Sequence, residues 1–487
     1  MSGGARAGED AAIEGVAGYE VVVGLEVHCE LSTATKLFCG CANAFGAPPN
    51  TQVCPVCLGL PGSLPVLNRR AVELAMRIGS ALHCEIRPST FHRKNYFYPD
   101  MPKDYQISQY DEPVNADGYL ELPGGARVGI ERAHIEEDTG KTTHVGGGGR
   151  IHDADHSLVD YNRAGVPLVE IVSRPDIRGA EQARSYVSEL RAVLVATGAS
   201  DGRMEEGSLR VDANVSVRRE GSEGLGTRCE VKNLNSLRSL GRAIDFEAER
   251  QVAVLRSGGR VVQETRHWDE DEGRTSSMRS KEEANDYRYF AEPDLVPLVP
   301  DEELLERATR AMPVLPAARR VRLSALVGDD TAADQVTTVV DLGLDDLVVA
   351  AAALGADASL ALRRAANEAA QRPEQARRID AGVFARLLSL ESAGTLSATQ
   401  SKAVLAEVLE SGGDPEEIAR RLGFEALPAA ELEAVLDEVV ASHPAEWERY
   451  VGGDDKVAQL LTGLVMRATR GRANGKAVAA ALASRRA

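Results

Sequence analysis

The stretch Val21-Val22-Val23-Gly24-Leu25-Glu26-Val27-His28-Cys29-Glu30-Leu31 decides how the first part of this chain folds. Apolar and polar residues alternate along it and β-branched residues are frequent, so it predicts a strand. The apolar residues share one face of this strand, whereas Glu26, His28 and Glu30 share the other. Two carboxylates beside an imidazole on a rigid backbone can hold a divalent cation. On a lone strand the same pattern is more often a solvated polar face.

Length and composition describe a soluble protein of several domains. The chain has 487 residues, of which 43% are hydrophobic and 27% charged, and its length predicts roughly three domains. A net charge of -18 argues against a general polyanion binder, although a local basic patch remains compatible with one. Residues 1–18 lack the layout of a signal peptide and predict a disordered leader. The longest apolar run, 347–356, is too short to span a bilayer, so we expect a cytoplasmic protein that does not enter a membrane.

Four of the seven cysteines are spaced as in a zinc site. Cys39-Gly40-Cys41 and Cys54-Pro55-Val56-Cys57 are two close pairs joined by a short loop. Each pair can present both sulfurs to one tetrahedral ion, and a site made of cysteines alone is typical of structural zinc. Cys29, Cys84 and Cys229 have no such spacing and are expected to be packed thiols.

Further acidic strands follow. Residues 119–130 predict a hairpin that leads into His134-Ile135-Glu136-Glu137-Asp138, where the paired Glu136 and Glu137 beside Asp138 are a possible cation site. Glu170 lies inside the otherwise apolar run 166–172, where an unpaired carboxylate would be costly, so we favour a cation as its partner.

Two glycine-containing segments lie between these strands. Gly140-Lys141-Thr142 is no P-loop, because the position that this motif requires to be glycine is Ile135. The four glycines at 146–149 are followed by no helix-opening pattern, so they predict a flexible connection and not a phosphate-binding loop.

Two later strands repeat the pattern of one apolar and one polar face. Residues 208–217 alternate between the two kinds, with Arg210 and Asp212 on the polar side, and Glu230 and Lys232 continue it on the next strand. Several such strands predict an antiparallel sheet whose open side is a charged cleft.

The segment 93–109 combines cations, amides and aromatic rings, including Lys94, Tyr96 and Lys103. Lysines suit phosphates and aromatic faces suit bases, so the segment favours a nucleotide or a nucleic-acid end. A polar loop that covers a sheet would also use tyrosines.

Ordered blocks of sequence resemble one family. Gly24–His28, Arg93–Asp100, Tyr105–Gln109, Glu136–Asp138, Met204–Arg210 and Asp286–Phe290 are similar to the GatB family, the B-type subunits of the tRNA-dependent aspartyl/glutamyl amidotransferases. The resemblance covers nearly the whole chain after the leader.

The resemblance implies an ATP- and Mg²⁺-dependent ligase of the carbon–nitrogen class. It would phosphorylate the side-chain carboxylate of Glu or Asp misacylated on tRNA, and ammonia would replace the phosphate. Ammonia would come from glutamine through a tunnel from an amidase-like glutaminase subunit of the A type, with a small C-type subunit completing a heterotrimer. The acceptor, Glu-tRNA(Gln), Asp-tRNA(Asn) or both, stays open.

The same resemblance implies roles for particular residues. The catalytic set is Glu26, His28, Glu137, Glu170, Glu205 and Glu206, of which the first four would hold Mg²⁺. The ATP-binding set is Lys94, Tyr96, Lys103, Arg210, Asp212 and Lys232. Zinc would be held by Cys39, Cys41, Cys54 and Cys57.

The expected fold class is α+β. A mainly antiparallel catalytic domain with a zinc-binding insertion, 19–293, would resemble glutamine synthetase. A helical domain, 294–410, and a small helical tail, 411–487, would follow, because Ala, Leu, Glu and Arg at helical spacing replace the alternating pattern. From Lys456 onward the tail has no acidic residue, which fits the tRNA-binding end that the resemblance implies; a solvated helical end is the alternative. Its cations are Arg467, Arg470, Arg472, Lys476, Arg485 and Arg486.

Two other classes of function fit part of the pattern. A zinc-bearing RNA-binding module without catalysis would explain the cysteines and the basic tail, but not the acidic strand faces. A metal-dependent nuclease would use the carboxylates on phosphodiesters. ATP turnover would decide against the first alternative, and intact RNA after incubation with uncharged tRNA would exclude the second.

Overall fold

The computed structural model describes residues 16–146, 154–278, 287–310, 312–328, 333–424, 429–469, 473 and 475–486. The chain forms two compact units, Met1–Ala317 and Ala318–Ala487. Most of the leader predicted at 1–18 and most of the glycine connection predicted at 146–149 lie outside the described residues.

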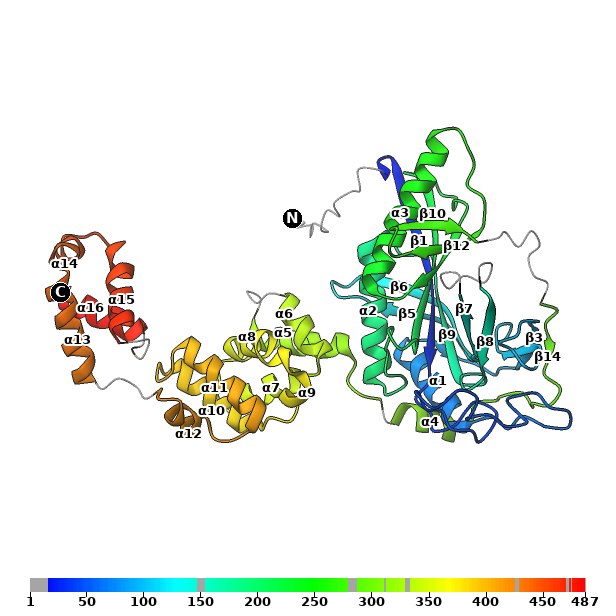
Figure 1. The fold of residues 1–487 in the computed structure, drawn as a ribbon, viewed down its shortest axis with the longest axis horizontal. Coiled ribbons are helices and arrows are strands. Elements are labelled where there is room, and N and C mark those ends of the chain that lie inside the picture. Colours follow the sequence, from blue (N-terminus) through cyan, green and yellow to red (C-terminus); the bar gives the residue numbers. More distant parts are fainter. Residues whose placement is uncertain are drawn as a thin grey trace. The chain divides into compact units, whose positions relative to one another are not determined.

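A large sheet dominates the first unit (Figure 1). Among the described residues its strands run in the order β13-β12-β11-β10-β1-β9-β6-β4-β3-β14, with β5 and β2 paired beside β6. Only β11 and β12 pair in parallel in this part of the chain, so the predicted mainly antiparallel sheet is confirmed. The strands are β1 (Tyr19–Glu30), β2 (Glu85–Ile86), β3 (His92–Asn95), β4 (Tyr105–Ser108), β5 (Asn115–Glu121), β6 (Arg127–Glu137), β9 (Pro167–Ser173), β10 (Leu209–Arg219), β11 (Cys229–Leu234), β12 (Thr265–Asp269), β13 (Arg274–Ser277) and β14 (Phe290–Ala291). A separate hairpin pairs β7 (Lys141–Val145) with β8 (His156–Asp160).

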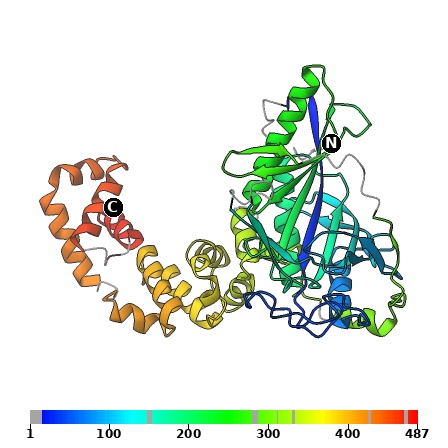
Figure 2. The same ribbon diagram turned by 45° about the vertical axis from the view of Figure 1, so that its right-hand side comes forward.

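The predicted first strand is confirmed as β1, which lies between β10 and β9 (Figure 2). Val23, Leu25 and Val27 are fully buried, whereas Glu26 and His28 on the other face are half-buried. The alternation in the sequence therefore separates a core face from a polar face.

Three helices cover the apolar face: α1 (Arg69–Ala81), α2 (Ala180–Ala196) and α3 (Leu237–Arg256). Figure 1 shows α2 and α3 side by side along the sheet. The predicted cap of α1 is confirmed, because the Asn68 side chain accepts hydrogen bonds from the backbone N–H groups of Arg70 and Ala71. With these helices in place, the other face of the sheet is left for polar groups.

The first unit extends past the boundary predicted at 293/294. Helix α4 (Glu302–Arg310) buries Leu304 and Ala308 in the same core as the sheet. The Arg77 guanidinium of α1 donates a hydrogen bond of 3.1 Å to the carbonyl oxygen of Ala308. The change in composition at 294 thus marks a change from strands to helices inside one packed unit.

The second unit is helical throughout its described residues, with two hydrophobic clusters. The first cluster includes Ile418 and Ala419 of α12, so the helix that follows the predicted break at 411–415 packs with the middle helices. The helices are α5 (Pro316–Val327), which begins at the end of the first unit, α6 (Ala333–Asp341), α7 (Asp345–Ala353), α8 (Ala358–Asn367), α9 (Pro373–Ala376), α10 (Ala381–Ser392), α11 (Ala398–Ser411), α12 (Pro415–Arg421), α13 (Ala429–Ser442), α14 (Pro444–Val451), α15 (Val457–Ala468) and α16 (Gly475–Arg486). None of the helices in the described ranges is long and apolar enough to cross a bilayer.

Candidate active site

Four polar side chains stand in one row across the polar face of the sheet. In the strand register Arg210 of β10 lies opposite His28 of β1, His28 opposite Glu170 of β9, and Glu170 opposite His134 of β6. His28 Nε2 lies 3.5 Å from Glu170 Oε2, and His134 Nε2 lies 3.9 Å from the same oxygen. The register of three strand pairs therefore places both imidazoles beside one carboxylate.

Glu136 completes a cluster with His28 and Glu170. One ligand atom from each of the three lies within 4.8 Å of the others. Glu136 Oε1 accepts a hydrogen bond from Ser108 Oγ at 2.7 Å and contacts His134 Nε2 at 3.1 Å. Because these neighbours fix its orientation, Glu136 presents its carboxylate to the cluster with little freedom. Two carboxylates and an imidazole are a donor set that fits a divalent cation.

Burial and neighbouring charges shift the pKa values of Glu170 and His28. Burial raises the pKa of Glu170, but His134, His28 and Arg132 outweigh this effect, so its pKa lies well below the ordinary value. For His28 burial acts in the other direction and lowers the pKa. The hydrogen bond with Glu170 outweighs burial, so the pKa of His28 is raised. The neighbouring imidazoles and the Arg132 guanidinium thus favour the carboxylate form of Glu170.

Glu26 lies next to the cluster and lines a cavity of about 430 Å³. Its Oε1 accepts a hydrogen bond of 2.9 Å from Asn214 Nδ2. Burial raises the pKa of Glu26, and the nearby charge of Glu170 raises it further. The cavity is of the size of a small-ligand site and mixes apolar with polar groups. It is lined by Val22, Gly24, Leu25, Glu26, Glu131, Val172, Ser173, Pro175, Asn214, Ser216, Leu225, Gly226, Thr227, Arg228 and Gln263.

The sequence predicted that Glu137 joins Glu26, His28 and Glu170 in one metal site. The structure places Glu137 elsewhere. Side chains alternate along β6, so Glu136 faces the cluster and Glu137 faces the opposite side of the sheet. There the Glu137 carboxylate forms a buried ion pair with Lys103 and accepts a hydrogen bond of 2.9 Å from the Ile107 backbone N–H. Lys103, predicted to bind ATP, is therefore also on that side.

Three of the predicted ATP-binding residues lie near the cluster in ion pairs. Arg210 Nη1 lies 2.8 Å from Asp138 Oδ2, and Lys232 Nζ lies 2.9 Å from Asp212 Oδ2. Asp212 stands opposite Glu26 in the register. These cations and carboxylates make the polar face around Glu26 and His28 a charged surface.

The remaining predicted residues are not members of the three-residue cluster. Glu205 and Glu206 are exposed in a turn before β10, where Glu206 pairs with Arg203 at 2.7 Å. Lys94 of β3 places its Nζ 4.9 Å from the ring centre of Tyr287, and Tyr96 stacks on Tyr98 at 4.6 Å. None of these four side chains belongs to the cluster.

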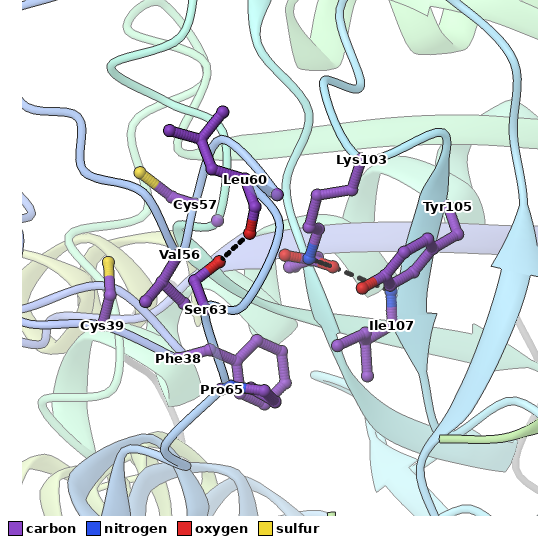
Figure 3. Close-up of a pocket in the computed structure, with 13 residues that line it drawn as sticks. Phe38, Cys39, Val56, Cys57, Leu60, Ser63, Pro65, Lys103, Tyr105 and Ile107 are labelled. Atoms are coloured by element: carbon purple, nitrogen blue, oxygen red, sulfur yellow. Dashed lines mark hydrogen bonds and ion pairs between the residues drawn. The ribbon is translucent and has the colours of Figure 1, made fainter. Parts of the chain in front are cut away.

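The four predicted zinc ligands come together. The sulfurs of Cys39, Cys41, Cys54 and Cys57 all lie within 4.8 Å of one another. Around tetrahedral zinc, sulfurs are roughly 3.8 Å apart, given Zn–S bonds of about 2.3 Å, so the set fits that ion. Figure 3 shows Cys39 and Cys57 at one side of a small cavity of about 60 Å³, with Lys103, Tyr105 and Ile107 at the other.

Buried Lys36 is a neighbour of the cysteines that the sequence did not indicate. Its side chain is fully buried, with Nζ 3.7 Å from Cys57 Sγ and 3.2 Å from the Tyr161 carbonyl oxygen. A hydrogen bond from Cys39 lowers the pKa of Cys57 to about 5, and the charge of Lys36 contributes to this shift. A cation beside thiolates offsets part of their negative charge.

The sequence indicated Glu136, with Glu137 and Asp138, as a possible cation site but assigned Mg²⁺ to Glu137, and it missed His134, Arg132 and Asn214 as parts of the site. For β6 a signal was present: Arg132, His134 and Glu136 alternate with apolar Ala133 and Ile135. Applied to that strand, the alternation rule would have preferred Glu136 over Glu137.

The cations of the tail are partly paired. Arg485 Nη1 lies 2.7 Å from Asp437 Oδ1, and Arg486 Nη1 lies 2.5 Å from Asp455 Oδ1. Lys456 and Arg467 are exposed. Arg470, Arg472 and the side chain of Lys476 lie outside the described part of the chain.

Comparison with known proteins identifies the family. Residues 21–306 match the GatB/GatE catalytic domain, and residues 354–485 match the GatB domain. The B-type subunit of aspartyl/glutamyl-tRNA(Asn/Gln) amidotransferase from Frankia casuarinae is 53% identical over 481 residues, which cover 95% of each chain. The proteins of the same name from Streptomyces avermitilis and Mycobacterium tuberculosis are 49% and 50% identical over 484 residues, covering 96% of this chain and 95% and 94% of theirs. This chain therefore belongs to the GatB family of amidotransferase subunits, carbon–nitrogen ligases that use glutamine as the amide donor.

Proposed function

We propose that this chain is the transamidating subunit of a tRNA-dependent amidotransferase. In the reaction, a carboxylate oxygen of Glu or Asp on misacylated tRNA attacks the γ-phosphorus of ATP, and ADP leaves. Ammonia then attacks the acyl carbon of the resulting acyl phosphate, and phosphate leaves with the bonding electrons. Glu-tRNA(Gln), Asp-tRNA(Asn) or both would be substrates. An A-type glutaminase partner would supply ammonia, and a small C-type partner would complete the complex.

The observation that carries this proposal is the cluster of His28, Glu136 and Glu170 beside a cavity of about 430 Å³. Glu26 joins the two features, because it lines the cavity and is close enough to Glu170 for the second charge to raise its pKa. We assign the nucleoside of ATP to the cavity and its phosphates to the side that meets the cluster.

A divalent cation, Mg²⁺ in the working enzyme, would be held by Glu136, Glu170 and His28 and would supply a Lewis acid for phosphoryl oxygens. The fit rests on the donor set and on its firm support by Ser108 and His134. The chain itself contributes fixed charges: Arg210 and Lys232 bring cations to the same face, and their carboxylate partners Asp138 and Asp212 hold them in place. A face with such fixed charges needs little reorganisation when phosphoryl charge moves.

A second proposal concerns the cysteines and the tail. Structural zinc would tie together the two cysteine pairs, and its free energy of binding would contribute to folding. The exposed cations Lys456 and Arg467 would contact tRNA phosphates. Neither assignment gives the cysteines or the tail a part in the chemical steps, which we assign to residues of the sheet.

The test is Glu170→Gln in the assembled complex. ATP-dependent phosphorylation of misacylated tRNA should fall by about 100- to 1,000-fold, the cost of removing one group that stabilises transition-state charge. Glutaminase activity, measured separately, should largely survive because it resides in the partner. Glu121→Gln is the matched control and should retain most of the activity, because Glu121 pairs with Arg127 at the end of β5, outside the cluster and the cavity. Normal phosphorylation by Glu170→Gln would show that the active site lies elsewhere.

A further inference from the structure

A row of aromatic rings adjoins the polar row that contains the cluster of His28, Glu136 and Glu170. Tyr110 meets the His134 ring edge-on, with ring centres 6.3 Å apart and planes at 82°. Tyr289 stacks on Tyr110 at 5.4 Å and 19°, and Tyr287 meets Tyr289 at 6.1 Å and 75°. We call Tyr110, Tyr287 and Tyr289 the tyrosine wall.

Two cations accompany the tyrosine wall. The Arg132 guanidinium lies 4.6 Å from the ring centre of Tyr110, and Lys94 Nζ lies 4.9 Å from that of Tyr287. Arg132 Nη2 is also 3.7 Å from Glu170 Oε1, so the same side chain contacts the cluster and the wall. Aromatic faces interleaved with cations are the combination that binds single-stranded nucleic acid.

The wall is assembled from distant parts of the sequence and is held firmly. The Asn95 side-chain amide donates hydrogen bonds to the carbonyl oxygens of Tyr287 and Arg288, at 2.8 and 2.9 Å. Pairing of Phe290 with Arg93 continues this attachment of residues 287–291 to β3. Rings fixed in this way lose little conformational entropy when a ligand stacks on them.

Aromatic surface remains open to solvent at this site. Tyr110 is 46% exposed, although it contacts the fully buried His134, and Phe290 at the far end is 47% exposed. Exposed apolar surface that is gathered beside polar groups is typical of interaction and ligand-binding sites.

We propose that the tyrosine wall binds the unpaired nucleotides at the 3′ end of the aminoacyl-tRNA. Bases stack on the tyrosine rings, and Arg132 and Lys94 neutralise the phosphates between them. The terminal nucleotide, which carries the amino acid, lies at the Tyr110 end, next to Glu170. This assignment rests on the proposed function, because it names how the substrate of that same site is held.

The strand order argues for the tRNA end over the adenine of ATP. The cluster lies on β1, β9 and β6, and the cavity of about 430 Å³ is lined from β1, β6, β9, β10 and the segment before β11. The wall lies on the β4, β3 and β14 side of β6, and none of its three tyrosines lines the cavity. A cavity of this volume suits one nucleotide, whereas a row of rings suits a strand.

The experiment uses the assembled complex and Glu-tRNA(Gln) whose terminal adenosine is replaced by fluorescent 2-aminopurine riboside. Stacking on tyrosine should quench the fluorescence of the wild-type complex. Tyr110→Ala and Tyr289→Ala should each reduce the quenching and raise the KM for tRNA by about 5- to 100-fold, the range for loss of one base–aromatic stack. The KM for ATP should change less than about twofold, because the cavity is untouched.

Matched variants separate stacking from folding. Tyr289→Phe keeps the ring and should have the low KM for tRNA of the wild type. Tyr289→Leu keeps apolar volume without a ring and should have a raised KM for tRNA. Phe45→Ala removes a ring that is 82% exposed on the loop between Cys41 and Cys54, and it should leave the quenching of 2-aminopurine fluorescence intact. Melting temperatures of all variants identify any that fail to fold.

Each outcome has one meaning. A raised KM for ATP with an unchanged KM for tRNA would assign the wall to adenine and overturn the inference, and so would unchanged quenching in both alanine variants. If the wild-type complex fails to phosphorylate misacylated tRNA with ATP, the proposed function falls. The quenching experiment still reports on the wall in that case, because it requires no turnover.

Discussion

Glu136 and Glu137 are adjacent in sequence and lie on opposite faces of the sheet. Glu136 belongs to the cluster with His28 and Glu170, whereas Glu137 pairs with Lys103 beside the cavity that Cys39 and Cys57 line. Both carboxylates are buried, so both need partners, but the partners differ in kind.

Glutamine substitutions at these two positions should therefore have different effects. Glu136→Gln should lower the affinity for Mn²⁺, used as a paramagnetic probe for the divalent site, by at least about tenfold, because even supporting groups of a metal site cost that much. Glu137→Gln should leave Mn²⁺ affinity intact and reduce the free energy of unfolding by about 3–5 kcal/mol, because it leaves the Lys103 charge buried alone. Titration of Mn²⁺ followed by electron paramagnetic resonance, together with thermal unfolding, checks both. Equal loss of Mn²⁺ affinity in the two variants would contradict the assignment of faces.

The cysteine cluster should hold structural zinc. Cys54→Ser should release about one zinc ion per chain and lower the melting temperature, because structural zinc contributes folding free energy. Cys84→Ser, outside the cluster, is the control and should keep the metal. Elemental analysis and thermal unfolding are the measurements. A Cys54→Ser protein that is free of metal and as stable as the wild type would refute a structural role.

The tail should bind tRNA through its exposed cations. The double variant Lys456→Glu/Arg467→Glu should raise the KM for tRNA and reduce the slope of log KM against log salt by about one for each phosphate that is no longer bound. Truncation would be a poorer test, because Val457, Leu461 and Val465 share a hydrophobic cluster with Leu436 and Val439.

Arg485→Ala provides the comparison for the tail, because Arg485 is already paired with Glu433 and Asp437. This variant should leave the salt dependence nearly unchanged. A loss of turnover at saturating tRNA in the Lys456→Glu/Arg467→Glu variant would contradict a role in binding alone.

Acid should weaken the first unit through Glu247. Burial raises the pKa of this fully buried carboxyl, but hydrogen bonds from Arg250 and Gln251 outweigh burial, so the folded-state pKa lies below the ordinary 4.5. A depressed folded-state pKa stabilises the fold above the unfolded-state pKa, and this stabilisation is lost as the pH falls through the folded-state value. Glu247→Gln should therefore lower the melting temperature at pH 7 and flatten its decline below about pH 4.5. Glu249→Gln, on the exposed side of α3, should follow the wild-type curve. A wild-type curve for Glu247→Gln would exclude this network as a source of acid sensitivity.

Much of the fold could be predicted because it depends on local patterns. The alternation from Val21 to Leu31 gives β1 and its two faces, and the apolar spacing after Asn68 gives α1 with its cap. The cysteine spacing correctly predicted that the four sulfurs lie together, because a tight turn fixes each pair locally. The boundary at 293/294 was a local change of composition, and it could not show that α4 packs on α1.

The candidate site depends on contacts between strands that are far apart in sequence. The sequence by itself determined which residues of β1 face away from the core, and it marked Glu26, His28 and Glu170 as carboxylates and imidazole in need of partners. Only the tertiary structure decided that Glu170 lies between His28 and His134, and that Glu136 rather than Glu137 joins them. The physical reason is strand register: a shift by one residue turns every side chain to the other face, and long-range pairing sets that register. The tyrosine wall likewise exists only because pairing of β14 with β3 brings Tyr289 beside Tyr110.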